Sequence, residues 1–219
     1  MTEYESDFDQ MLFYLPLSGS TFKKVYYDDL LERAVSKFVP ADDLIVPYTA
    51  TSLDDAEAVI HVVKMSENEL RKQMVSGFYS DIELTKPTDT ITNELEEKER
   101  EVEGLTKSQR VDAMYTILEC HVNLDLEGFE DLGPDGEPTG IKLPYVVTIE
   151  EGSRKVLSIR RNFAPNDPKK NKIQYFVHFK FLPGLGFYGL GLIHMIGGLS
   201  RTATAALRQL LDAGTLSNL

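Results

Sequence analysis

The chain has 219 residues, of which 42% are hydrophobic and 26% are charged. This length suits one ordinary domain or two small ones, and the apolar fraction is large enough to form a core. The formal net charge is −12, with no cluster of lysine and arginine. Tight binding of nucleic acid through its phosphates is therefore disfavoured, whereas a surface past which DNA slides remains compatible with this charge.

The single cysteine, Cys120, excludes an intramolecular disulfide and fits a reducing compartment. The acidic stretch over residues 1–9 lacks the basic and apolar regions of a signal peptide. Secretion by that route is not expected.

The first elements in chain order are predicted from apolar and alternating patterns. Residues 8–17 are apolar and predict a short helix, and Ser18-Gly19-Ser20 predicts a turn. A β-hairpin follows, formed by residues 21–28 and 34–39, and short strands are predicted at 44–46 and 58–65.

A helix is predicted after residue 65. Ser66 and Glu69 have the spacing of a capping box, in which each side chain bonds the other residue's backbone amide. Gly77 favours the end of this helix near Ser76, because glycine tolerates the left-handed conformation. Residues 85–107 then change in character, and residues 94–103 hold six glutamates against Lys98 and Arg100. This composition predicts a mobile acidic connector.

The second half of the chain predicts more strands. Residues 114–126 alternate, with Leu118, Cys120 and Val122 on one side and Glu119 and His121 on the other, which predicts a strand with one buried face. Residues 132–140 predict a loop, residues 145–150 and 154–162 a second hairpin, and residues 173–181 a further strand. A glycine-rich turn and a helix over residues 188–211 end the pattern.

The predicted fold class is α+β, with a mostly antiparallel sheet, short helices and one long C-terminal helix. Residues 1–183, including the connector at about 85–107, are predicted to form one domain. Residues 184–219 are predicted to form the glycine-rich turn and the helix.

Residues 184–189 match the pattern G-x-G-x-x-G between a strand and a helix, which is the setting of a dinucleotide site. Pro183 breaks the strand, and the thirty residues after Gly189 are too few for the second strand of a βαβ unit. The preferred interpretation is a flexible turn, with nucleotide binding by the segment 184–198 kept as an alternative.

A membrane anchor is the other alternative for this segment. Residues 181–200 carry no charge and are long enough to span a bilayer. They also contain Pro183, six glycines and His194, and the helix continues through Arg201. A buried helix in an oligomer accounts better for this pattern, so no membrane partner is expected.

No pattern of residues indicates catalysis or a metal site. The histidines lack metal-ligand spacing, and the neighbours Cys120 and His121 point to opposite faces of a strand. The acidic pairs Asp42-Asp43 and Asp54-Asp55 are typical of turns and caps. No catalytic residue, cofactor or metal is predicted, and the chain is not expected to be an enzyme.

Three segments resemble portal proteins of short-tailed phages and related prophages. They are residues 179–219, which begin FKFLPGLGFYGLG, residues 11–28 (MLFYLPLSGSTFKKVYYD) and residues 38–44 (FVPADDL). The resemblance implies a wing-like domain and a first stem helix from about Tyr188. Portal proteins of this family are longer, so the sequence is expected to be an excised piece without the clip, the second stem helix and the crown.

The resemblance also implies a function and partners. These are a ring of usually twelve copies at one capsid vertex, a channel for packaging and ejecting double-stranded DNA without sequence specificity, and contacts with terminase, capsid, scaffolding and tail proteins. The implied location is the portal vertex of the virion, and the host cytoplasm during assembly.

The C-terminal helix carries the predicted contacts between copies. Its apolar residues recur at three- and four-residue spacing, and others lie off that stripe, which predicts burial on more than one side. Two glycines inside the helix cost about 1 kcal/mol each relative to alanine, and close approach of a neighbouring helix would offset this. The predicted interface residues are Leu192, Ile196, Gly197, Gly198, Ala203, Ala206 and Leu210.

Overall fold

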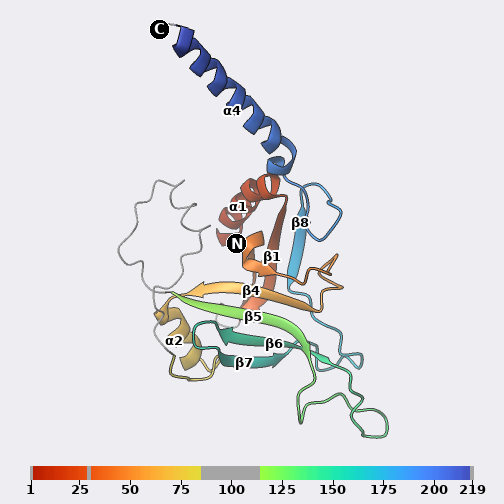
Figure 1. The fold of residues 1–219 in the computed structure, drawn as a ribbon. Coiled ribbons are helices and arrows are strands. Elements are labelled where there is room, and N and C mark those ends of the chain that lie inside the picture. The colour runs from red at the N-terminus through yellow and green to blue at the C-terminus, as the bar shows by residue number, and fades with distance from the viewer. Residues whose placement is uncertain (1, 29–30, 85–113, 218–219) are drawn as a thin grey trace. The chain divides into compact units, whose positions relative to one another are not determined.

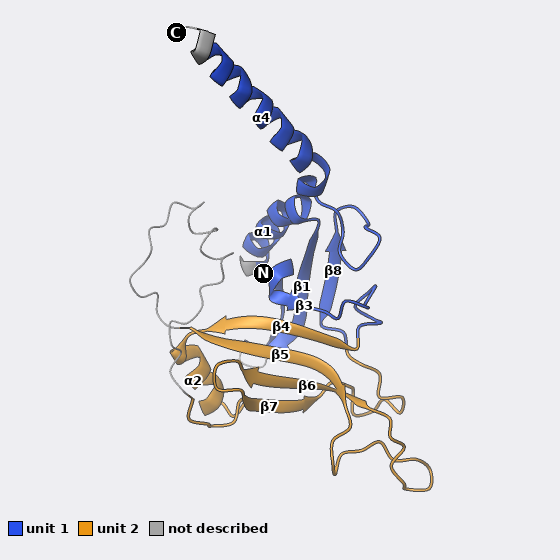
Figure 2. Ribbon diagram, in the orientation of Figure 1, with its two compact units in different colours: residues 1–56, 174–219 blue, residues 57–173 orange. Residues whose placement is uncertain are grey.

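The computed structural model describes residues 2–28, 31–84 and 114–217 (Figure 1). The fold is α+β with mostly antiparallel strands, which confirms the predicted class. The chain divides into two compact units, Met1–Ala56 with Gln174–Leu219, and Glu57–Ile173 (Figure 2). The predicted acidic connector at about 85–107 lies outside the described residues.

The first unit combines the two ends of the chain around a three-stranded sheet. Its strands lie in the order β2-β1-β8, and both pairs are antiparallel. Phe22 on β1 faces Val39 on β2 and His178 on β8, and Phe22 and Val39 are buried. The elements are α1 (Thr2–Ser18), β1 (Ser20–Asp28), β2 (Arg33–Pro40), η1 (Ala41–Asp43), β3 (Leu44–Ile45), β8 (Phe176–Lys180) and α4 (Leu192–Ser217).

The helix α1 begins earlier than the apolar pattern predicted. It includes the acidic residues Glu5 and Asp7, whose negative charges are stabilised by the partial positive charge at the N-terminal end of a helix. Met11 is its buried contact with the unit, and the amide of Phe38 donates to the Asp7 carboxylate at 2.8 Å. The acidic N-terminal stretch is therefore part of a packed helix.

The second unit contains four strands in the order β4-β5-β6-β7, all paired antiparallel, and the helix α2. The predicted capping box is present, because Ser66 accepts from the Glu69 amide and Glu69 accepts from the Ser66 amide. Gly77, with a φ of 74°, follows the end of the helix as predicted. The elements are β4 (Ala58–Met65), α2 (Glu67–Val75), β5 (Tyr115–Leu124), β6 (Leu143–Glu150) and β7 (Lys155–Arg161).

The prediction of a single buried face on β5 was wrong. The most buried residues are Tyr115, Ile117 and His121, which share the side predicted to be polar. Tyr115 and Ile117 pack with Leu70 and Met74 of α2, and this helix covers that side of the sheet. The opposite side is half-buried.

The boundary expected after residue 183 does not separate the two units. The pairing of β1 with β8 holds the C-terminal segment in the same unit as the N-terminal residues, so α4 shares a unit with α1. The pairing of β1 with β8 joins residues far apart in the sequence. The local patterns that suggested the boundary cannot reveal such a long-range pairing.

Candidate subunit interface on helix α4

The backbone that leads into α4 packs against the end of α1. A side chain added at Gly189 would place its Cβ 2.5 Å from the carbonyl oxygen of Gly19, and one at Gly191 would lie 2.5 Å from the Gly19 nitrogen. Gly19 itself has a φ of 90°. Only glycine permits this approach of backbone to backbone, so the glycines around residue 190 fix where α4 begins.

Hydrogen bonds and rings complete this junction. The hydroxyl of Ser20 accepts from the amide of Gly189 at 2.7 Å and lies 3.1 Å from Nε2 of His178. The rings of His178, Phe22 and Phe187 contact one another, with the His178 centroid 4.4 Å from Phe22 and 4.8 Å from Phe187, and Phe22 6.0 Å from Phe187. Residues of β1, β8 and the loop before α4 thereby form one packed cluster.

These contacts explain why α4 begins at Leu192 and not at Tyr188 as predicted. The amide of Gly189 is bonded to Ser20, and the amide of Leu190 donates to the carbonyl of Leu182 at 2.8 Å. Leu190 and Leu182 form an antiparallel bridge, so the backbone at residue 190 is extended and the helix cannot include it. The ring of His194 accepts from the Gly191 amide at 3.1 Å and caps the first turn.

The junction predicts a pH dependence. Burial lowers the pKa of His178 from 6.5 to about 4, with a smaller effect of Lys180. The unfolded chain therefore binds a proton near pH 6.5 while the folded chain does not, so stability is full above pH 6.5 and falls as the pH drops toward 4. Because the site is only half-buried, we expect a loss of about 1 kcal/mol between pH 7.5 and 5.5.

Urea unfolding of wild type and His178→Asn at these two pH values measures the effect. The variant keeps a polar side chain but does not titrate, so its stability should change less with pH than that of wild type. Val177→Asn, at an exposed position on the same strand, is the matched control, because it introduces the same asparagine without removing a titrating group, and it should keep the wild-type pH dependence. Equal pH dependence in wild type and His178→Asn would contradict the prediction.

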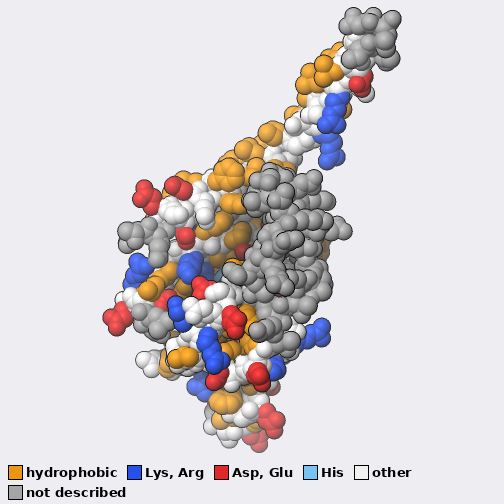
Figure 3. All heavy atoms as spheres, turned by 90° about the vertical axis from the view of Figure 1, so that its left-hand side faces the viewer, with side chains coloured by type: hydrophobic (Ala, Val, Ile, Leu, Met, Phe, Trp, Pro, Cys, Tyr) orange, Lys and Arg blue, Asp and Glu red, His pale blue; other side chains and the backbone are white. Residues whose placement is uncertain are grey.

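Beyond the junction, α4 is exposed along its described length apart from Gly197, which is partly buried. Leu199 has 73% of its surface exposed, and Leu207, Leu210 and Leu211 are similarly open. In Figure 3 hydrophobic side chains follow the helix down to its base. Exposed apolar surface of this extent indicates a contact with another molecule.

The side chains of α4 divide by size and charge around the helix. Large aliphatic residues share one side with Ala203 and Ala206, because they recur at three- and four-residue spacing: Leu192, Ile196, Leu199 and Leu210. Gly198 and Ala205, seven residues apart, lie on a second side, here called the small-residue side, which also carries Gln209 and which borders the third side at Ala205. The two sides are different in shape.

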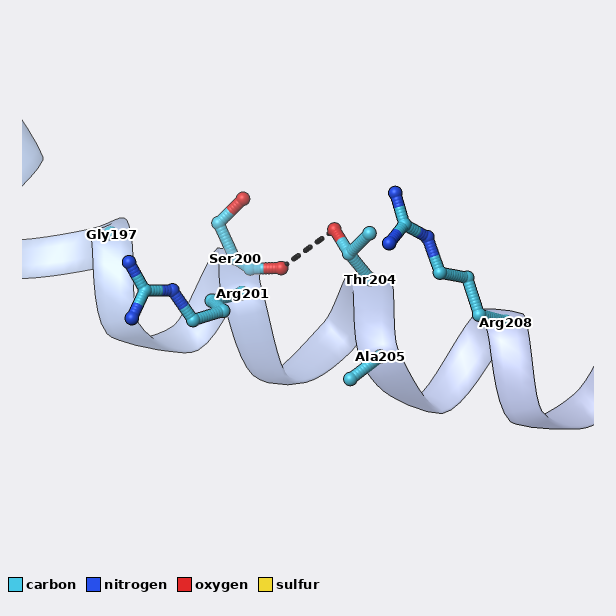
Figure 4. Close-up of a pocket in the computed structure, with 6 residues that line it drawn as sticks. All are labelled: Gly197, Ser200, Arg201, Thr204, Ala205 and Arg208. Atoms are coloured by element: carbon cyan, nitrogen blue, oxygen red, sulfur yellow. Dashed lines mark hydrogen bonds between the residues drawn. The ribbon is translucent and has the colours of Figure 1, made fainter.

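A third side is polar and basic. Gly197, Ser200, Arg201, Thr204, Ala205 and Arg208 line a shallow surface groove (Figure 4). The hydroxyl of Thr204 donates to the carbonyl of Ser200 at 2.9 Å, so it is satisfied within the helix. Among the predicted interface residues, Gly197 thus lies with the arginines, whereas Leu192, Ile196, Ala203, Ala206 and Leu210 lie together on the aliphatic side.

The glycine-rich motif serves packing. Gly184 approaches the carbonyl oxygen of Tyr188, where a Cβ would lie 2.5 Å away, and Gly189 contacts Gly19. The helix does not start at the motif, as a phosphate-binding turn requires, but at Leu192. Within the described part of the chain, every helix is either too short or too polar to span a bilayer.

The other candidate side chains have structural partners. Nε2 of His121 lies 2.8 Å from the Glu119 carboxylate, and the Cys120 thiol donates to the Leu118 carbonyl. The carboxylate of Asp55 accepts from the hydroxyl of Thr51 and from the amides of Thr51 and Ser52. These bonds, chiefly the one from the Thr51 hydroxyl, lower the pKa of Asp55 to about 2, and the arrangement is typical of a turn. In the described ranges no group of three or more His, Cys, Asp or Glu side chains is arranged to hold a metal ion.

An α+β body that presents a long, exposed and largely apolar helix is the architecture of a structural subunit that assembles with other copies or proteins. The chain belongs to the phage SU10 portal protein family, whose model matches residues 23–219. It is thus a bacteriophage structural protein that functions in DNA packaging and capsid assembly, and portal proteins are not enzymes as a family. A search of curated proteins found no match to the chain.

Proposed function

We propose that the chain is a subunit of the portal ring at the capsid vertex, and that α4 is the stem-like helix through which copies associate. The ring, a dodecamer, forms the channel through which double-stranded DNA is packaged and ejected, and it offers docking sites to terminase, capsid, scaffolding and tail proteins. The chain then belongs to the portal vertex of the virion and to the host cytoplasm during assembly. The observation that carries this proposal is the exposed apolar surface of α4.

The two unlike sides of α4 support a ring over a two-fold dimer. A two-fold contact uses the same patch on both partners, whereas a ring uses two different patches that fit each other. The aliphatic side around Leu199 and the small-residue side around Gly198 are such a pair. Close approach of a neighbour at Gly198 also explains a glycine at a position where an added Cβ would meet nothing within 4 Å in the single chain.

The charge of α4 fits a helix beside DNA. Its charged residues are Arg201, Arg208 and Asp212, so the helix is basic in a chain of net charge −12. Two separated arginines attract the phosphate backbone weakly and without reading bases. Such a surface favours passage of DNA over tight binding.

Removing the aliphatic side chains tests this function. We expect Leu199→Ser combined with Leu210→Ser to raise the dissociation constant of self-association by tenfold or more. Each leucine taken out of a buried contact loses about 1.5–3 kcal/mol, and about 1.4 kcal/mol corresponds to a factor of ten. Sedimentation velocity over a dilution series measures the constant.

The matched control is Arg201→Ser combined with Arg208→Ser. It places the same two serines in the same helix, with a similar cost in helix propensity, but on the polar side. It should associate like wild type. A wild-type chain that stays monomeric throughout the series, or equal association of the two double variants, would contradict the proposed function.

A further inference from the structure

The helix α1 changes character halfway along its length. In its first half the outward residues are polar and exposed, as in Glu5, Ser6 and Asp9. From Met11 to Leu17 the sequence is MLFYLPL, with no charged residue on any side. Met11 is buried, but Phe13 has 68% of its surface exposed. A helix that is apolar all round is normally buried all round.

The orientation of α1 is fixed by contacts on its inner side. Asp7 accepts the amide of Phe38, and the ring of Tyr14 lies 5.6 Å from that of Phe38, centroid to centroid. The ammonium of Lys23, which is 5% exposed, lies 4.1 Å from the centre of the Tyr4 ring. Because these contacts hold the inner side, Leu12 and Phe13 cannot turn inward without breaking them.

The outer surface of α1 adjoins the base of α4. The backbone at Gly191 approaches the carbonyl of Leu17 and the nitrogen of Gly19, and both helices belong to the same unit (Figures 1 and 2). Exposed Leu192 and Ile193 open the first turn of α4. Exposed apolar side chains of both helices thus flank the junction, with Leu17 at the end of α1 and Leu192 and Ile193 at the start of α4.

We propose that the outer surface of α1, formed by Leu12, Phe13 and Leu17, is covered by a second copy of this chain. This rests on the proposed ring, and it extends the contact between copies from α4 onto the body of the subunit. The continuity of the two apolar surfaces singles out the second copy as the occupant, since a neighbour that packs on the first turn of α4 reaches the end of α1 as well. A phenylalanine in such a contact buries about 150–250 Å².

Three single variants test the proposal by sedimentation velocity. Phe13→Ser should raise the dissociation constant of self-association about tenfold, the equivalent of about 1.4 kcal/mol, and Leu12→Ser should raise it in the same direction. Tyr48→Ser is the control, because Tyr48 is a fully exposed aromatic residue in the same unit but outside both helices. It should leave the constant within about twofold of wild type. Thermal unfolding shows whether each variant is folded. If Phe13→Ser unfolds at a lower temperature than wild type, its weaker association could result from lost stability, and the dissociation constant of Leu12→Ser then decides whether α1 contacts a second copy.

The outcomes separate this inference from the proposed function. Weaker association in Leu12→Ser and Phe13→Ser, with Tyr48→Ser unchanged, supports a second copy on α1. Association equal to wild type in both α1 variants, while the Leu199 and Leu210 double variant dissociates, overturns the α1 contact and leaves the role of α4 intact. That result would mean that the outer surface of α1 contacts a different protein. If neither the α1 variants nor the Leu199 and Leu210 double variant weakens self-association, both the α1 contact and the proposed role of α4 are overturned.

Discussion

Replacing Gly191 by alanine is expected to destabilise the protein by about 3 kcal/mol or more. The added Cβ would lie 2.5 Å from the nitrogen of Gly19, a backbone atom that cannot move without disturbing the end of α1. The amide of Gly19 donates to the carbonyl of Leu15 at 2.9 Å, so a shift at this point also strains the last turn of that helix. The start of α4 would be displaced, and self-association should weaken together with stability.

Gly186→Ala is the matched control, because a Cβ at Gly186 meets nothing within 4 Å. The same substitution in the same loop should be neutral or slightly stabilising, since alanine lowers the entropy of the unfolded chain. Urea unfolding of the two variants measures the difference. A free energy of unfolding for Gly191→Ala within about 0.5 kcal/mol of that for Gly186→Ala would show that the close approach is not needed.

Much of the fold follows from short-range patterns in the sequence. The hairpin of β1 with β2, the hairpin of β6 with β7 and the capped start of α2 were all predicted, because alternation, turn residues and caps act over a few residues. The capping box at Ser66 and Glu69 is the clearest case, since two side chains three residues apart satisfy each other's backbone.

Features that depend on distant contacts were not predicted. The glycines at 189 and 191 resembled part of a phosphate-binding turn or a flexible linker, and their role appears only beside Gly19. The burial of Tyr115 and Ile117 on β5 depends on Leu70 and Met74 of α2, and the sequence around β5 shows only alternation. In both cases the partner lies far away in the chain.

The apolar side of α4 could be predicted from the sequence, and its role as an interface stays a prediction. The spacing of Leu192, Ile196, Ala203, Ala206 and Leu210 identified one apolar side of α4, and the structure places these residues on an exposed helix. The sequence did not indicate that α1 carries a second exposed apolar surface. An all-round apolar segment such as residues 11–17 predicts burial, and only the fold shows which side the rest of the unit leaves open.

In the proposed ring, copies of α4 associate head to tail, with the aliphatic side of one against the small-residue side of the next. Ala203 and Ala205 are suited to test it, because they are exposed alanines that lie on nearly opposite sides of the helix, about 3 Å apart along its axis. Each is changed to cysteine in a separate chain in which Cys120→Ser removes the native thiol. A short bismaleimide then links cysteines that approach in the assembly.

We predict efficient linkage only when the Ala203→Cys and Ala205→Cys chains are mixed, with each chain given a different mass so that the products can be assigned by mass spectrometry. A chain with both substitutions should give a ladder of linked products longer than a dimer, as a ring requires. If the Ala203→Cys chain alone links to itself as efficiently as the mixture does, and the doubly substituted chain stops at the dimer, the contact is two-fold and the head-to-tail ring is contradicted.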